Sequence, residues 1–195
     1  SSYLKSGLWY RFAFDTTGVH KINKNFLNNL GVNTATINPK NIKIYGHGGK
    51  SLPLLNSETL SDDLIENSIQ VIGENDNVFD DEDYILMYAV GPKRYNLDNN
   101  SHINPYSDDA YYYINISSGN GSRMSFAAEP DGLADVMFES FHDYKFVETD
   151  QYNIAKLGRR WFGHRFYVEN VREFEFNFPN PVSYTHLRAH ETTRH

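Results

Sequence analysis

Two apolar stretches indicate the fold class: YILMYAV at residues 84–90 and AYYYINI at residues 110–116. A short apolar run of this length, rich in aromatic and β-branched residues, is typical of a buried strand. Further segments alternate large apolar residues with polar ones, which predicts strands with one buried face. These segments lie at 7–14, 19–22, 41–45, 69–72, 123–127, 141–147, 163–168 and 173–178.

The spacing of these segments predicts an all-β fold, mainly an antiparallel β-sandwich or a barrel-like sheet, with one or two short helices. Turn residues at 15–18 predict a hairpin between the first two strands, because Asp, Thr and Gly favour tight turns. The Gly/Ser/Asn segment 117–122 predicts a second hairpin, between the strand at 110–116 and a partner at 123–127. The continuous apolar run at 84–90 is expected to form a centrally buried strand.

Two local signals concern helices and turns. Asn23 is expected to cap a short helix, and Gly31 is placed to end it. The segment Gly46-His47-Gly48-Gly49-Lys50 lacks the spacing of a phosphate-binding P-loop. We therefore expect a tight turn there, with glycines at positive φ.

The composition of the 195 residues excludes several classes of protein. The formal net charge is -7, which argues against nucleic acid as the main partner, because phosphate binding needs clustered Lys and Arg. No run approaches the roughly 20 apolar residues of a membrane-spanning helix. The chain has no Cys, so these residues hold no disulfide, no thiolate zinc site and no cysteine nucleophile.

The end of the chain differs in composition from the rest. Residues 182–195 read VSYTHLRAHETTRH, and within them SYTHLRAHET resembles a translated sequencing adapter. We expect this tail to be non-native and leave it out of the fold prediction. A metal pair formed by His186 and His190 is the alternative, but it lacks a third ligand. We therefore expect a β-rich domain over residues 1–181. It forms either a single domain or two subdomains, and the sequence does not locate a boundary between them.

Five segments of the chain form a distinctive series: GLWYRFAFDTTGVHKI (7–22), FLNNLGVNTATINPKNIKIYGHGGKSLP (26–53), ENDNVFDDEDYILMYAVGP (74–92), YYYINI (111–116) and GRRWFGHRF (158–166). Taken in this order, they resemble the amino-terminal region of the PorU-type sortases of the type IX secretion system, which are related to the gingipain-like cysteine peptidases. In the last segment His164 stands where the family commonly has an acidic residue, so no role is carried over to that position.

The resemblance implies a parent protein at the outer face of the outer membrane in a Bacteroidota bacterium. Such a sortase removes the carboxy-terminal signal of secreted cargo and joins the cargo to an anionic lipopolysaccharide. Its catalytic His and Cys belong to a peptidase domain that follows the region resembled here. No catalytic residue is therefore carried over, and the chain is expected to be an amino-terminal fragment that is inactive alone.

The partners implied by the resemblance are the chain's own downstream peptidase domain, other type IX secretion components and secreted cargo. Two alternatives stay open. One is a stand-alone surface adhesion or carbohydrate-binding β-domain, suggested by the tyrosine-rich strand at 111–113 and the loop at 95–106. The other is a gingipain-like protease that is itself secreted.

Two clusters are candidate sites. Asp76, Asp80 and Asp83 supply the oxygen ligands that calcium prefers, although their spacing does not match an EF-hand. The alternative is a solvated acidic turn whose Asp side chains accept hydrogen bonds from nearby amides.

The second cluster is Arg159, Arg160 and Trp161, which combines two cations with a large aromatic ring. It is either a docking surface, since Arg and Trp are favoured at interfaces, or a structural motif. The structural interpretation is the expected one, because Trp is mostly buried and an Arg can stack on it.

Overall fold

The computed structural model divides into two compact units, Ser1–Ala127 and Ala128–His195, and each unit is described by itself. None of the helices in the described part is both long and apolar enough to cross a membrane. The predicted tail at 182–195 lies outside the described residues. The structure describes residues 2–5, 7–53, 55, 57–58, 63–98, 100–127, 144–154, 156, 161–167 and 171–178.

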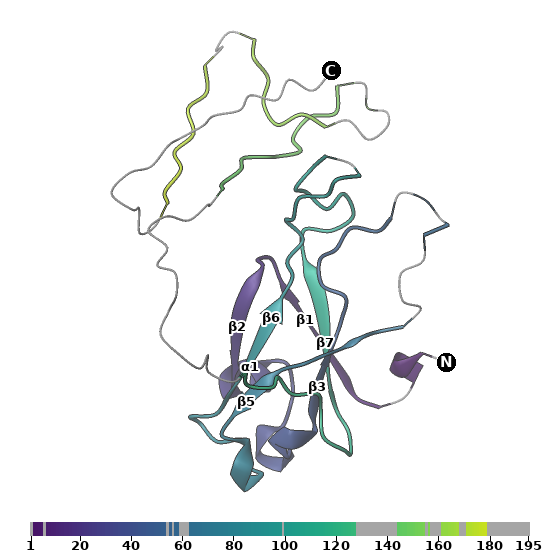
Figure 1. Ribbon diagram of the computed structural model, residues 1–195, viewed down its shortest axis with the longest axis vertical. Coiled ribbons are helices and arrows are strands. Elements are labelled where there is room, and N and C mark those ends of the chain that lie inside the picture. The colour runs from purple at the N-terminus through teal and green to yellow at the C-terminus, as the bar shows by residue number, and fades with distance from the viewer. Residues whose placement is uncertain are drawn as a thin grey trace. The chain divides into compact units, whose positions relative to one another are not determined.

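The first unit consists of two antiparallel sheets (Figure 1). The strand order is β1-β7-β3-β4 in the four-stranded sheet and β2-β6-β5 in the three-stranded sheet. Together with one short α-helix, this confirms the predicted all-β class. The elements are β1 (Trp9–Phe14), β2 (Gly18–Asn23), α1 (Lys24–Asn29), β3 (Ile42–Tyr45), β4 (Glu66–Asn67), β5 (Gln70–Ile72), β6 (Tyr84–Ala89) and β7 (Ala110–Ile116), with 3-10 turns η1 (Tyr3–Lys5), η2 (Thr34–Thr36), η3 (Pro39–Asn41) and η4 (Glu74–Asp76).

Both sheets contribute side chains to a single hydrophobic core. From the larger sheet, β7 sends Tyr112 and Ile114 into this core. From the smaller sheet, β6 sends Ile85 and Met87. The alternation of buried and exposed positions along both strands gives each sheet one inward face, as in a β-sandwich.

The strand β6 is central in its sheet, as predicted, but it is not buried on both faces. Ile85, Met87 and Ala89 are buried, whereas Tyr88 is 56% exposed. The apolar run concealed this alternation, because the outward positions also carry large side chains. A lysine covers part of the outward face of β6: the ammonium of Lys21 lies 4.0 Å from the centroid of the Tyr84 ring.

The first predicted hairpin is wrong, because the two strands belong to different sheets. The strand β1 pairs with β7, and β2 pairs with β6. The chain crosses from one sheet to the other at 15–18, where Gly18 has φ +152°. The rings of Phe14 and His20, on either side of this crossing, stack with centroids 3.8 Å apart.

The second predicted hairpin is also wrong. Both edges of β7 are already occupied, by β1 and β3, so the segment 123–127 has no free edge of β7 to join. Instead Arg123 forms a parallel bridge with Ile69, and the amide of Met124 donates to the carbonyl of Ile69 at 2.9 Å. The segment therefore adds to the strand region beside β5.

The short helix is confirmed. The side-chain oxygen of Asn23 accepts a hydrogen bond from the amide of Phe26 at 2.9 Å, which is the expected amino-terminal cap. Leu27 buries its side chain completely in the core. Gly31 follows the helix with φ +94°, a conformation that favours glycine.

In the second unit, the described parts of three predicted strands do not form strands. Residues 144–147, 163–167 and 173–178 belong to no ladder among the described residues, where Tyr152 and Phe162 form an isolated bridge. Phe174 and Phe176 remain 46% and 44% exposed. Alternation of apolar and polar residues gives a segment one apolar face, but it does not supply a neighbouring strand. A segment becomes part of a sheet only when its backbone forms hydrogen bonds with such a neighbour.

The hydroxyl of Tyr112 links β7 to Val90, which directly follows β6. The side chain of Tyr112 is 2% exposed, and burial raises its pKa. The hydroxyl accepts from the amide of Val90 at 2.8 Å and donates to the carbonyl of Val90 at 3.3 Å. We expect Tyr112→Phe to lower the free energy of unfolding by about 1–3 kcal/mol, because the Val90 amide loses its partner.

Urea denaturation of both proteins measures this loss. Tyr111→Phe is the matched control, since Tyr111 is 40% exposed. The control should change stability by no more than about 0.5 kcal/mol. Equal losses in the two variants would contradict the role given to the Tyr112 hydroxyl.

Candidate functional site

Three of the segments quoted above meet in the first unit at what we call the glycine junction: Thr17, Gly48, Gly49, Val90 and Gly91. The amide of Gly49 donates to the carbonyl of Val90 at 2.7 Å. The amide of Gly91 donates to the hydroxyl of Thr17 at 2.9 Å. Hydrogen bonds donated by the backbone amides of Gly49 and Gly91 thus join three segments that are far apart in the sequence.

The junction depends on glycine for two different reasons. Gly46 and Gly48 have φ +151° and +74°, which confirms the predicted turn with glycines at positive φ. At Gly49 the requirement is space: a Cβ atom would lie 2.4 Å from the carbonyl carbon of Gly91 and from the nitrogen of Pro92. The GHGG segment is therefore explained by chain packing rather than by phosphate binding.

A hollow of about 340 Å³ lies beside the glycine junction, within the size range of small-ligand sites. Lys50 and Arg94 line it, but so does the carboxylate of Asp98. The hydroxyl of Tyr95, another lining residue, donates to Asn100 at 2.6 Å within the same loop. The mixed charge of this lining does not indicate one class of ligand.

The acidic stretch at 74–83 is organised by hydrogen bonds to its own backbone. Asp76 accepts from the amide of Val78 at 3.0 Å. Asp83, only 8% exposed, accepts from the amide of Asp80 at 2.8 Å. No group of three or more potential metal ligands occurs among the residues that the structure describes.

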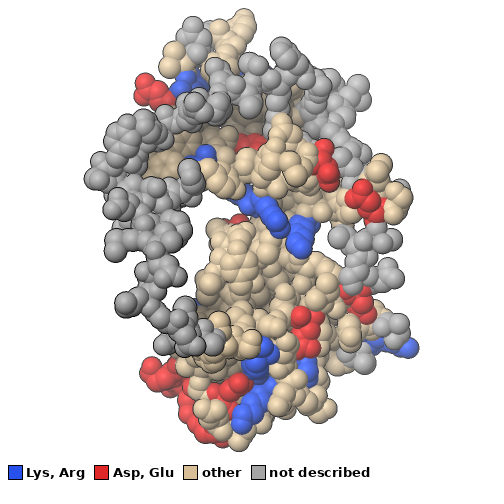
Figure 2. Space-filling model, viewed as in Figure 1, with Lys and Arg blue, Asp and Glu red and all other residues tan. Residues whose placement is uncertain are grey.

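Basic side chains from elsewhere in the first unit neutralise this stretch. Lys24 pairs with Asp81 at 2.8 Å, and Arg123 pairs with Glu74 at 2.9 Å. Lys40 donates to the side-chain oxygen of Asn77, also at 2.9 Å. In Figure 2 acidic and basic side chains lie among one another at the lower end of the first unit. This arrangement relieves repulsion between the carboxylates.

The pair formed by Lys24 and Asp81 has a defined pH dependence. The hydrogen bond from Lys24 lowers the pKa of the Asp81 carboxyl, and the same bond raises the pKa of the Lys24 ammonium. A lowered carboxyl pKa gives stability that is lost as the pH falls through the folded-state value. A raised ammonium pKa gives stability that is lost as the pH rises through its folded-state value.

A calcium ion held by Asp76, Asp80 and Asp83 stays a prediction, and a calcium titration tests it. A saturable rise of the Tm on adding calcium, absent in Asp80→Asn, would support the ion. An unchanged Tm would support the hydrogen-bonded acidic turn. Asp80 is the appropriate variant because its carboxylate is exposed, whereas Asp76 and Asp83 cap backbone amides.

The second candidate cluster is described only in part. Arg159 and Arg160 lie outside the described residues. Trp161 is 45% exposed and Phe162 is 41% exposed, so the described part of the chain does not enclose the indole. The prediction that Trp161 lies in a core thus finds no support in its burial.

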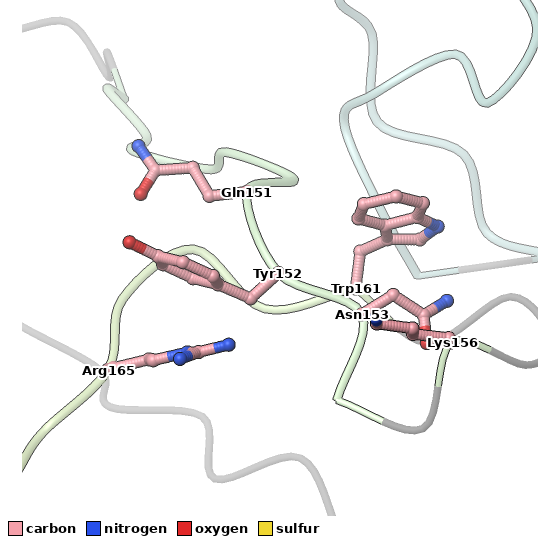
Figure 3. A pocket seen from close by; sticks show the side chains of 6 residues that line it. All are labelled: Gln151, Tyr152, Asn153, Lys156, Trp161 and Arg165. Atoms are coloured by element: carbon pink, nitrogen blue, oxygen red, sulfur yellow. The ribbon is translucent and has the colours of Figure 1, made fainter.

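A hollow near Trp161 was not foreseen from the sequence (Figure 3). The segment GRRWFGHRF includes Trp161 and Arg165, but no spacing rule connects these two residues with the four lining residues that precede them. Its most defined contact is between the guanidinium of Arg165 and the ring of Tyr152, 4.3 Å from the ring centroid. The residues that line it are Gln151, Tyr152, Asn153, Lys156, Trp161 and Arg165.

Large apolar side chains are exposed throughout the described part of the second unit. The buried hydrophobic residues of the described chain all come from the first unit. Clustered exposed apolar residues mark surfaces that contact other molecules or domains. The exposed residues include Tyr144, Ile154, Phe166, Tyr167, Val171, Phe174 and Phe176.

The chain is similar to known proteins only among the solved structures. No family model matches the sequence. No curated protein matches it either. Among solved structures, the chain is similar to dimeric latent PorU from Porphyromonas gingivalis, with 25% sequence identity and a TM-score of 0.47. The match covers 70% of this chain but only 12% of the length of that chain.

Proposed function

We propose that this chain is the noncatalytic, β-rich amino-terminal region of a PorU-type sortase at the outer face of the outer membrane. Its role is to scaffold and dock the peptidase domain of the same protein. The observation that carries the proposal is the ordered resemblance of five segments between residues 7 and 166. The contact between Gly49 and Val90 supports it, because it joins two of these segments directly.

The chemistry proposed for the parent needs a group that this chain does not contain. A sortase of this kind forms an acyl-enzyme on a cysteine thiolate, and the amine of an acceptor then resolves it. The 195 residues include no Cys. The nucleophile must therefore come from the downstream peptidase domain, and this chain contributes structure rather than catalysis.

The docking role is assigned to the exposed apolar side chains of the second unit. Phe174 and Phe176 share one side of the alternating segment FEFNF, and both are more than two-fifths exposed. The acidic residues Glu173 and Glu175 alternate with them. Such a segment gains stability when another surface covers its aromatic side.

The docking role is tested by a double substitution, Phe174→Ser with Phe176→Ser, in the full-length sortase. We expect the peptidase domain to become more sensitive to limited proteolysis, because the surface that covers the two rings loses its contact. Glu173→Gln with Glu175→Gln is the matched control, since it leaves both rings in place. Identical proteolysis of all three proteins would contradict the docking role.

The noncatalytic role is tested with the purified chain. Peptides that end in carboxy-terminal secretion signals should be neither cleaved nor joined to an amine acceptor. Cleavage that persists after removal of contaminating proteases, and that co-purifies with the chain, would overturn the proposal. Circular dichroism should show folded β-structure in the same sample, so that inactivity is not mistaken for unfolding.

A further inference from the structure

The sequence contains a single Asn-Gly pair, Asn120–Gly121, in the segment 117–122 that follows β7. Asn120 is exposed, and its side-chain amide makes no hydrogen bond within the described part of the chain. Glycine has no side chain, so the amide nitrogen of Gly121 can approach the side-chain carbonyl carbon of Asn120 without a steric clash. An asparagine in this setting forms a cyclic succinimide more readily than one that precedes a larger residue.

The native fold directs the attacking nitrogen away from Asn120. The amide of Gly121 donates to the carbonyl of Lys40 at 2.9 Å, and Gly121 itself is buried. The next amide, that of Ser122, donates to the carboxylate of Glu66 at 2.6 Å. Succinimide formation therefore requires a local opening of the segment 117–122 that releases the Gly121 amide from Lys40.

A lysine restrains the other side of the same segment. The ammonium of Lys43 donates to the carbonyls of Ser117, Ser118 and Gly119 at 3.0, 3.2 and 2.9 Å. It also donates to the hydroxyl of Ser117 at 3.0 Å. Asn120 thus lies between two stretches that are each held to β3 or to the turn before it, and loss of either set of bonds would increase the open fraction.

We propose that Asn120 is a site of spontaneous deamidation, and that opening of the segment 117–122 sets its rate. The amide nitrogen of Gly121 gives up its proton and bonds to the side-chain carbonyl carbon of Asn120. The bond from that carbon to the side-chain nitrogen breaks, and the nitrogen leaves with the proton as ammonia. Water then opens the succinimide at either of its two carbonyls, which yields aspartate or isoaspartate. Water is the only co-reactant.

The isoaspartate product does not fit the native packing. It lengthens the backbone by one carbon directly before Gly121, where even an added Cβ atom would overlap the carbonyl oxygen of Ile42. The guanidinium of Arg123 donates to that same carbonyl at 3.2 Å, so the displacement also affects the Arg123 contacts. The modification thereby limits the lifetime of the folded first unit. This inference does not rest on the proposed scaffold role, and the two are tested separately.

The test incubates the complete chain at mildly alkaline pH, folded in buffer and unfolded in guanidinium chloride, and locates deamidation by peptide mass spectrometry. We expect deamidation at Asn120 in both samples, about 10-fold or more slowly in the folded one, because only the open fraction reacts. Asn67 is the internal reference, since it precedes Ser68 and its amide donates to the carbonyl of Gly46 at 3.0 Å. Equal rates at Asn120 in the two samples, or faster deamidation at Asn67, would overturn the proposal.

A lysine variant tests whether opening of the segment sets the rate. Lys43→Met should accelerate deamidation at Asn120 in the folded chain, because the three carbonyls lose the ammonium that holds them. Lys93→Met is the matched control, since Lys93 is exposed and its ammonium makes no hydrogen bond within the described residues. Circular dichroism should show that both variants are folded, and equal rates in the two would contradict the restraint by Lys43.

The consequence for packing is tested on the products. Asn120→Asp keeps an ordinary backbone, so it should melt at the same Tm as the unmodified chain. The isoaspartate form, separated from the incubated sample by chromatography, should melt at a lower Tm. An isoaspartate form with an unchanged Tm would overturn the effect on the lifetime of the first unit.

Discussion

Replacing Gly49 with alanine is expected to lower the free energy of unfolding of the first unit by about 3 kcal/mol or more. The added Cβ would lie 2.4 Å from the carbonyl carbon of Gly91 and 2.4 Å from the nitrogen of Pro92. Both are backbone atoms, so no side-chain rotation relieves the overlap. Moving the two segments apart to make room for the Cβ atom would also break the hydrogen bond from the Gly49 amide to the Val90 carbonyl.

Gly119→Ala separates the effect of space from the effect of backbone conformation. Gly119 has φ +90°, and a Cβ placed there would meet nothing within 4 Å. Its cost is therefore conformational only, about 1–2 kcal/mol. Urea denaturation followed by circular dichroism measures both variants, and equal losses would show that the glycine junction is not closely packed.

The second large effect is expected at Arg123, whose guanidinium joins three parts of the first unit. It pairs with Glu74 at 2.9 Å and donates to the carbonyls of Pro39, Lys40 and Ile42 at 3.0, 3.0 and 3.2 Å. The side chains of Arg123 and Glu74 are each only 22% exposed. Removing the cation leaves the largely buried carboxylate of Glu74 without its ion-pair partner, and each of the three carbonyls loses one hydrogen bond.

We expect Arg123→Met to lower the free energy of unfolding by about 3 kcal/mol, the lower end of the range for breaking a buried ion pair. Arg123→Lys should recover only a minor part, because one ammonium cannot reach Glu74 and the three carbonyls together. The double variant Arg123→Met with Glu74→Gln should lose less than Arg123→Met alone. Full recovery by lysine in urea denaturation would contradict the multidentate role of Arg123.

The positions of the strands could be predicted from the sequence, but their pairing could not. Apolar runs and alternation depend on neighbouring residues, so β6 and β7 were located within one residue of their ends. Pairing depends on residues far apart: β7 lies between β1 and β3, which precede it by more than 60 positions. The turn residues at 15–18 were correctly identified as a turn, yet they lead from one sheet to the other.

The same holds for the candidate sites: contacts between residues close in the sequence could be predicted, and contacts between distant residues could not. The Asp-rich turn at 74–83 was foreseen as one of two alternatives, because Asp side chains cap amides within a few residues. Its cations come from Lys24, Lys40 and Arg123, and no local pattern connects these with the turn. The hollow at Trp161 depends on the bridge between Tyr152 and Phe162, which alternation alone did not indicate.

Long-read sequencing of the source DNA across the codon for Pro181 tests the proposal that this chain is the amino-terminal region of a longer surface sortase. We expect the reading frame to continue past Pro181, without the sequence of residues 182–195, into a gingipain-like domain that carries a catalytic His and Cys. A stop codon directly after His195 in the source DNA would contradict the account, because the tail would then be native and no peptidase domain would follow.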